Sequence, residues 1–315
     1  TVPVLSWNST STTIAGITSM SGLDANLLSS PFGLFVDSAS SLYIADWGNN
    51  RIQKWLAGAS NGTTVAGQEN GTSGLSSSEL YLAAGVLVDS SGNMYVADTW
   101  NHRIQLWASG ATFGTTVAGT GAPGSANNEL NLPYGIARDT STGTLYIADA
   151  NNHRVMRYLS GAASGTVVAG GNGPGTNTSQ LYAPVSIYFE ASSNSLVICN
   201  YIGNNIVRWV LGASSWTLIA GDINGASGST STLLNQPIGM TVDYLGNVYV
   251  ADAVNFRIQL FLAGQSNGTT IAGVTGISGT NSTLLGIPYA LTLDSQLNLY
   301  VADTGNNRVL MFGRF

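Results

Sequence analysis

A tripeptide, Val-Ala-Gly or Ile-Ala-Gly, recurs six times along the 315-residue chain and constrains the fold more than any other feature. Its glycines are Gly16, Gly67, Gly119, Gly170, Gly221 and Gly273. Successive glycines are 51 or 52 residues apart, and this period is typical of a repeat architecture. A repeat that covers the whole chain predicts one domain over residues 1–315, although the length alone would suggest two.

Each repeat contains four runs that are typical of strands. In the first repeat they are GLFVD from Gly33, SLYIAD from Ser41, RIQKWL from Arg51 and TTVAG from Thr63. Short β-rich runs separated by Gly, Asn and Ser indicate antiparallel hairpins. Six such units and no helical period predict an all-β fold, a six-bladed β-propeller of four-stranded antiparallel blades.

The ends of the chain indicate how this ring closes. The last repeat has no fourth strand at the C-terminus, whereas the strand-like run Thr12–Gly16 has no blade before it. We therefore expect the N-terminal strand to complete the last blade. Residues 1–7 duplicate repeat positions that Val309–Phe315 already fill. We expect them to form a leader outside the regular third strand, because Pro3 has no N–H for a central ladder, and to add little stability.

A second repeated phrase, YVADTWNHRIQLW in Tyr95–Trp107, contains His102, one of two histidines in the chain. We assign the equivalent positions of the six copies to Asn50, His102, His153, Asn205, Phe256 and Asn307. Asparagine and phenylalanine cannot exchange a proton as histidine does, so no proton-transfer role is common to all six. The phrase predicts architecture rather than catalysis.

The residues Asn101-His102-Arg103-Ile104 resemble the NHL repeat, and the resemblance extends over the whole chain. Long segments between blades, such as TGAPGSANNELNLPYG ending at Gly135, are similar to those of the long NHL variety of secreted and cell-surface proteins. The resemblance implies a six-bladed propeller. Proteins of this kind include RNA-binding regulators, sensor ectodomains, adhesion scaffolds and a peptide-amidating lyase, so the resemblance implies a fold and not one function.

Acidic and basic residues recur with the phrase, which favours a structural role for them. An aspartate is followed by an arginine five residues later in five copies, as in Asp98 and Arg103, and Asn200 replaces the aspartate in the fourth. An arginine fork and a carboxylate suit a pair of fixed geometry, within one blade or across to the next.

We assign no catalytic residue and no cofactor. A transition-metal site usually needs three or more protein ligands, so His102 and His153 are weak metal candidates. Cys199 is the single cysteine, which leaves no internal disulfide.

Candidate ligand-binding residues follow from the topology. Antiparallel strands reverse at every turn, so the loops between second and third strands share one face of the ring with the starts of the first strands. Aromatic residues that do not repeat occupy positions on this face: Phe32, Trp47, Trp100, Tyr134, Tyr201 and Tyr289. Such residues carry much of the energy of recognition sites, although wedges between blades are an alternative reading.

Arg138 is a further candidate, because the equivalent first-strand position is apolar in the other repeats. A charge at such a position needs a partner or solvent. It is either an arginine that reaches solvent at the channel edge or a ligand contact.

The composition excludes some classes of binding partner. Charged residues make up 8% of the chain, the net charge is −6 and Lys54 is the single lysine, so nucleic acid and anionic membrane surfaces are poor partners. Our leading hypothesis is a monomeric, non-enzymatic, extracellular module that binds a protein, peptide or glycan. The alternatives are a propeller hydrolase or lyase with a divalent metal in the central channel, and a structural spacer of a larger protein.

Overall fold

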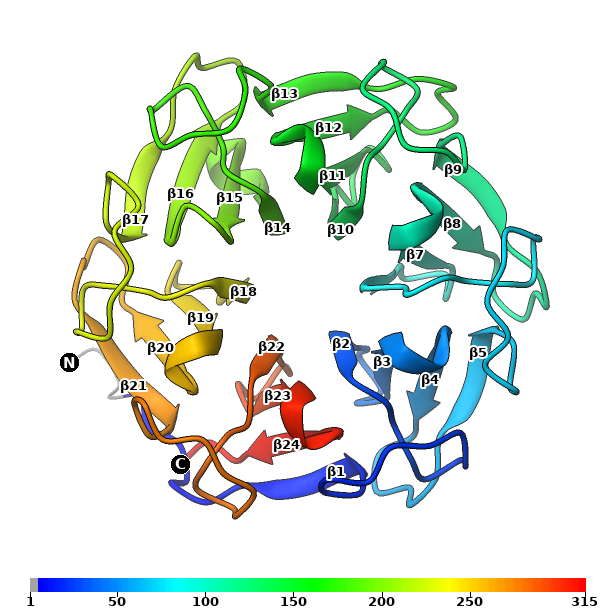
Figure 1. The fold of residues 1–315 in the computed structure, drawn as a ribbon, viewed down its shortest axis with the longest axis vertical. Helices are drawn as coiled ribbons and strands as arrows, with labels where there is room; N and C mark the ends of the chain where they lie inside the picture. The colour runs from blue at the N-terminus through cyan, green and yellow to red at the C-terminus, as the bar shows by residue number, and fades with distance from the viewer. Residues whose placement is uncertain (1–4) are drawn as a thin grey trace.

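The computed structural model describes residues 5–315, which form six four-stranded antiparallel sheets arranged as the blades of a ring (Figure 1). Blade 1 consists of β2 (Pro31–Val36), β3 (Leu42–Asp46), β4 (Arg51–Trp55) and β5 (Thr63–Gly67). Blade 2 consists of β6 (Gly85–Val88), β7 (Met94–Asp98), β8 (Arg103–Trp107) and β9 (Thr115–Gly119). Blade 3 consists of β10 (Pro133–Arg138), β11 (Leu145–Asp149), β12 (Arg154–Tyr158) and β13 (Thr166–Gly170).

The remaining blades follow the same order from the channel outwards. Blade 4 consists of β14 (Pro184–Glu190), β15 (Ser195–Asn200), β16 (Asn205–Val210) and β17 (Thr217–Gly221). Blade 5 consists of β18 (Pro237–Val242), β19 (Val248–Asp252), β20 (Arg257–Phe261) and β21 (Gly268–Gly273). Blade 6 consists of β22 (Pro288–Leu293), β23 (Leu299–Asp303), β24 (Arg308–Phe312) and the N-terminal strand β1 (Thr12–Gly16).

The predicted closure is confirmed. Strand β1 pairs antiparallel with β24, with Thr12 opposite Met311 and Gly16 opposite Arg308. Figure 1 shows blue β1 lying along red β24 in this blade. The ring is therefore tied by hydrogen bonds between strands from opposite ends of the chain.

The leader differs from our expectation. Trp7 forms an isolated bridge with Arg314 beyond β24, so it lies outside the third strand as predicted. However, its side chain is buried, and its indole lies edge-on to Tyr249 of blade 5 at 5.6 Å between ring centroids. Its Nε1 donates to the Leu297 carbonyl of blade 6 at 2.8 Å. Trp7 therefore makes contacts that we did not expect of the leader, and Pro3 lies outside the described residues.

The hydrophobic core lies between neighbouring blades. One cluster, for example, joins Tyr43 and Ile52 of blade 1 to Val96 and Trp107 of blade 2. The second strands of all blades except blade 2 are buried at every residue, because both faces of a radial sheet are covered by its neighbours. Among the described residues, no helix has the length and apolar character needed to cross a membrane.

Short 3-10 helices follow the second strand in five blades and define one face of the ring, which we call the η face. They are η1 (Trp47–Asn49), η2 (Thr99–Asn101), η3 (Ala150–Asn152), η5 (Ala253–Asn255) and η6 (Thr304–Asn306). The remaining one, η4 (Ala191–Ser193), lies between the first and second strands of blade 4 and thus at the opposite end. Figure 1 views the ring with the five helices towards the reader.

Candidate functional site

Each repeated aspartate is the centre of a buried polar network. The Asp98 carboxylate accepts the Tyr81 N–H at 2.7 Å, Asn101 Nδ2 at 2.8 Å and Arg103 Nε at 2.7 Å. Arg103 also donates to three carbonyls of the segment that enters its blade: Leu75, Ser76 and Glu79. The pairing therefore lies within one blade. Burial raises the pKa of the Asp98 carboxyl, and the three hydrogen bonds lower it.

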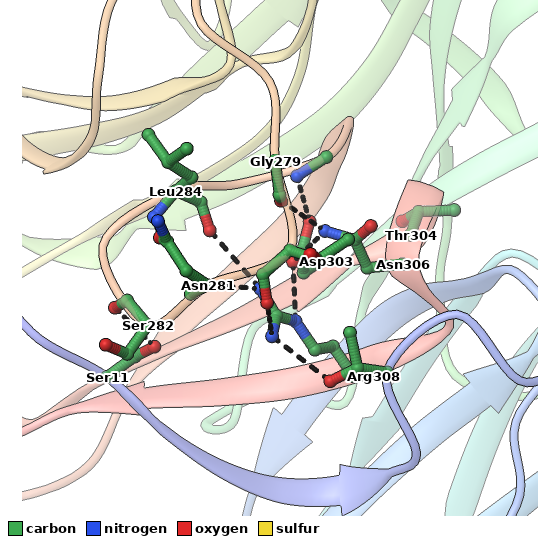
Figure 2. A network of polar contacts seen from close by, with 12 residues as sticks. Ser11, Gly279, Asn281, Ser282, Leu284, Asp303, Thr304, Asn306 and Arg308 are labelled. Atoms are coloured by element: carbon green, nitrogen blue, oxygen red, sulfur yellow. Dashed lines mark hydrogen bonds and ion pairs between the residues drawn. The ribbon is translucent and has the colours of Figure 1, made fainter.

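Figure 2 shows the same network in blade 6, where the Arg308 guanidinium lies between the Asp303 carboxylate and the carbonyls of Asn281 and Leu284. Blades 1, 3 and 5 repeat the ion pair at 2.7 to 2.8 Å between the arginine Nε and the carboxylate: Asp46 with Arg51, Asp149 with Arg154, and Asp252 with Arg257. These acids and arginines are fully engaged in the architecture.

Blade 4 carries a neutral version and corrects one assignment. Asn200 Nδ2 donates to Asn205 Oδ1 at 2.9 Å, so Asn205 occupies the arginine position. The histidine position belongs to Asn204, which has the same left-handed backbone as His102, with φ of 50° at both residues. Our assignment of Asn205 to the histidine position was wrong by one residue. In the other copies the arginine follows the aspartate by five residues, and the same spacing from Asn200 leads to Asn205.

Both histidines act as hydrogen-bond acceptors between blades. His102 Nδ1 accepts the Leu132 N–H at 3.1 Å, and His153 Nδ1 accepts the Ala183 N–H at 3.2 Å. Burial lowers the pKa of each imidazole, while the Asp149 charge raises it. Within residues 5–315, no group of three or more His, Cys, Asp or Glu side chains is placed to hold a metal ion.

Four aromatic side chains, which we call the aromatic mouth, converge on the η face at the end of the central channel. They are Phe32, Tyr134, Tyr201 and Tyr289, from blades 1, 3, 4 and 6. The Phe32 ring lies 5.5 Å from that of Tyr134 and 4.9 Å from that of Tyr289, measured between centroids. Rings from blades that are not adjacent in sequence therefore meet over the channel.

Burial and neighbouring phenols raise the pKa of two tyrosines of the aromatic mouth. Burial raises the pKa of Tyr134, and the neighbouring Tyr289 and Tyr201 raise it further. Burial followed by Tyr201 likewise raises the pKa of Tyr289. The Tyr201 hydroxyl donates to Gln236 Oε1 at 3.2 Å. Gln236 was not among our candidates, although it is an amide at a position that other repeats give to Leu82, Leu132 and Ala183.

Close approach of the inner strands explains how the rings meet. A Cβ atom on Gly33 would lie 2.2 Å from the Ala84 carbonyl oxygen, so a glycine is required where β2 approaches β6. Ala84 takes the position in blade 2 that Phe32 takes in blade 1, and it is buried. Its small side chain leaves room for the rings of blades 1 and 3 to meet across blade 2.

A cavity of about 300 Å³ lies along the channel beneath the aromatic mouth. The six inner strands line it, with Leu34, Ser186 and Thr292 among the lining residues. Arg138 also lines it, but at the end of β10, four residues beyond Tyr134 and thus towards the face opposite the mouth. Its guanidinium lies 5.5 Å from the Tyr95 ring centroid.

The two candidate tryptophans lie apart from this group. Trp100 is exposed and packs against Tyr81 of the same face at 5.7 Å between centroids. Trp47 is partly buried, and its Nε1 has no hydrogen-bond partner in the described chain. The structure thus brings together four of the seven predicted site residues.

Known proteins resemble this chain in sequence and in fold. The family model for the NHL repeat matches residues 80–106, 130–158 and 234–261. NHL repeat-containing protein 2 of Bos taurus is 28% identical over 338 residues, which cover 89% of this chain and 46% of that protein. The chain therefore spans less than half the length of this relative.

Two solved structures illustrate the shared fold. An auxiliary nutrient binding protein of Bacteroides ovatus superposes with a TM-score of 0.71 at 12% identity, over 99% of this chain and 77% of that one. A gluconolactonase of Xanthomonas campestris superposes with a TM-score of 0.66 at 14% identity, over 93% and 88% of the two chains. These likenesses show the shared fold, and the matched repeats with the ring of six blades make this chain a six-bladed β-propeller that contains NHL repeats.

Proposed function

We propose that this propeller is a non-enzymatic binding module that takes a protein, peptide or glycan ligand at the aromatic mouth. The observation that carries the proposal is the contact of Phe32 with both Tyr134 and Tyr289 over the channel. Equivalent positions in blades 4 and 5 hold Val185 and Ile238, so the repeat itself does not require aromatic residues there. Clustered aromatic side chains are the usual anchors of recognition sites.

The polar residues of the repeats support binding rather than catalysis. The repeated aspartates are buried and paired, and both histidines use Nδ1 to accept a backbone N–H. A general base must be free to accept a proton from a substrate, and these groups are already engaged. The fold does not decide the question, since both a binding protein and a gluconolactonase share it.

We further propose that the module acts outside the cell. The single lysine and the low charged content support this setting. Five asparagines of Asn-x-Ser/Thr sequences are also exposed to solvent: Asn61, Asn70, Asn177, Asn267 and Asn281. Fractionation of cells that express the tagged natural protein tests this proposal. Recovery of the protein in the cytoplasm alone would contradict it.

Peptide and glycan arrays probed with the purified protein test the proposed binding. We expect a restricted set of ligands to bind, and Phe32→Ala with Tyr289→Ala to abolish the signal. Tyr81→Ala is the matched control, because it removes an aromatic ring of the same face that lies outside the mouth. A protein that binds neither array would favour the spacer hypothesis, and metal-dependent turnover of a substrate would favour the enzyme.

A further inference from the structure

The aromatic mouth has the chemistry of a site for a neutral sugar. We propose that a pyranose ring of glucose configuration, as in a β-linked glucan, stacks at the mouth against the rings of Phe32 and Tyr134, beside the ring of Tyr289. This inference rests on the proposed binding function and names the ligand class.

Two of the rings form a shallow platform rather than a groove: the planes of Phe32 and Tyr134 are tilted by 36° to each other, and Tyr289 packs against Phe32 in a T-shaped arrangement at 61°. Phe32 contacts the other two rings at 4.9 and 5.5 Å between centroids, and these contacts leave no gap between the rings for a side chain. The face of an aromatic ring is partially negative. A pyranose with equatorial hydroxyls presents axial C–H groups on both flat faces, and these carry partial positive charge. The shapes and the charges of the two surfaces therefore match.

Hydrogen-bonding groups at the platform are neutral. The Tyr134 and Tyr289 hydroxyls form no hydrogen bond within residues 5–315, and the Tyr201 hydroxyl is paired with the Gln236 amide. A phenol both donates and accepts, as each sugar hydroxyl does. Burial raises the pKa of Tyr134 and of Tyr289 above the ordinary value of about 10, so both phenols are protonated at neutral pH.

The mouth disfavours a charged ligand. Of the residues that line the channel within the described chain, Arg138 is the one that carries a charge at neutral pH, and it lies towards the opposite face. An ionic group that left water for the mouth would lose hydration without gaining a partner. Uncharged sugar hydroxyls lose less hydration free energy, and they can form hydrogen bonds with the phenols and the Gln236 amide.

A peptide fits the platform less well. Proline-rich segments dock into grooves between aromatic side chains, where the ridges of the extended peptide insert. The contacts of Phe32 with Tyr134 and Tyr289 close such grooves at the centre of the mouth. The observations therefore favour the sugar, and the peptide becomes an outcome of the test.

Titration with methyl β-glucoside and with cellotetraose, followed by saturation-transfer NMR and calorimetry, tests the inference. We expect saturation transfer to the axial ring protons and tighter binding of the tetramer. Tyr134→Ala should weaken binding about tenfold, which corresponds to about 1.4 kcal/mol. Tyr289→Ala, which removes the ring beside the platform, should also weaken binding. Tyr134→Phe keeps the ring and should weaken binding only a few-fold. Tyr81→Ala should bind as the unaltered protein does.

The outcomes separate the inference from the proposed function. Binding of a proline-rich peptide at the mouth without any sugar would overturn the inference and leave the binding function intact. Unchanged sugar affinity in both alanine variants would show that the sugar binds elsewhere and would overturn the inference. Failure of every sugar and peptide would overturn both proposals. If the alanine variants do not fold, Phe32→Leu keeps the apolar volume without the π face, and unchanged sugar affinity in that variant would also overturn the inference.

Discussion

His102 accepts the backbone N–H of Leu132 through Nδ1 at 3.1 Å, and this contact, the seam hydrogen bond, ties blade 2 to blade 3. Four other seams have it, with His153, Asn50, Asn204 and Asn307 as acceptors. The donors all have positive φ: Ser30, Leu82, Leu132, Ala183 and Gln236. In five of the six blades, the position that names the repeat therefore holds a hydrogen-bond acceptor, which is an amide or a neutral imidazole.

The two histidine seams should weaken in mild acid. Burial lowers the pKa of His102 and His153, so the folded imidazoles prefer to be neutral. Their contribution is therefore present above the unfolded pKa of about 6.5 and is lost as the pH falls through the lower folded pKa. Protonation turns Nδ1 into a donor that faces another donor.

We expect the melting temperature to fall between about pH 7.5 and about pH 5 by more in the unaltered protein than in His102→Asn with His153→Asn. The asparagines keep an acceptor that does not titrate, as in blades 1, 4 and 6. Each lost bond should cost about 1 kcal/mol. Parallel melting curves over this pH range would contradict the role given to the histidines.

The seam between blades 5 and 6 lacks this bond, because Phe256 occupies the acceptor position. Ile287, the corresponding donor residue, does not share the positive φ of the other five. A β-branched residue is strained in that conformation, so an acceptor alone should help little. We expect Phe256→Asn and Ile287→Ser to stabilise together by about 1 kcal/mol more than the sum of their single effects.

Denaturant titrations of the two single variants and the double variant measure this coupling. Asn307→Ala is the matched control, because it removes an existing seam hydrogen bond and should destabilise by about 1 kcal/mol. Strict additivity of the two seam substitutions would show that the bond does not form there.

The repeat predicted the strands, their order and the closure of the ring, because every blade restates the same pattern. It did so to the residue for β1, Thr12–Gly16. The contacts of Trp7 were not predicted, because Trp7 lies outside the repeat and has no counterpart in the other blades. The sequence could have placed Arg138 at the far end of the channel. A strand rises about 3.3 Å per residue, and Arg138 lies four residues beyond Tyr134.

The convergence of the aromatic mouth could be predicted only in part. Phe32, Tyr134 and Tyr289 were assigned to one face from the topology, but their contacts depend on ring dimensions that no local pattern contains. The approach of β2 to β6 at Gly33 and the small Ala84 decide which rings touch. These relationships exist only after the ring has closed.

The ion pairs should act on stability and not on binding. Asp98→Ala leaves the buried Arg103 guanidinium without its carboxylate, and removal of one partner of a buried pair costs about 3 to 5 kcal/mol. Asp98→Asn with Arg103→Asn copies the neutral pair of blade 4 and should cost less. Chemical denaturation gives the free energies of unfolding, and ligand titration of the folded fraction gives the affinity. An unchanged stability with lost binding would reveal a functional role instead.

The N-terminal segment should contribute in two separable steps. Trp7 packs on Tyr249 of blade 5 and donates to the Leu297 carbonyl of blade 6, so it bridges the seam that lacks the hydrogen bond on the η face. Trp7→Ala should destabilise by about 3 kcal/mol, and Trp7→Phe, which loses the indole donor, by about 1 kcal/mol.

Deletion of residues 1–16 should be more severe, because it removes β1 and leaves the edge of β24 unpaired and prone to aggregation. Soluble yield and melting temperature of the three variants beside the full chain measure these effects. A melting temperature unchanged by Trp7→Ala would show that the seam holds without the tryptophan, and a stable, soluble protein without residues 1–16 would refute closure through β1.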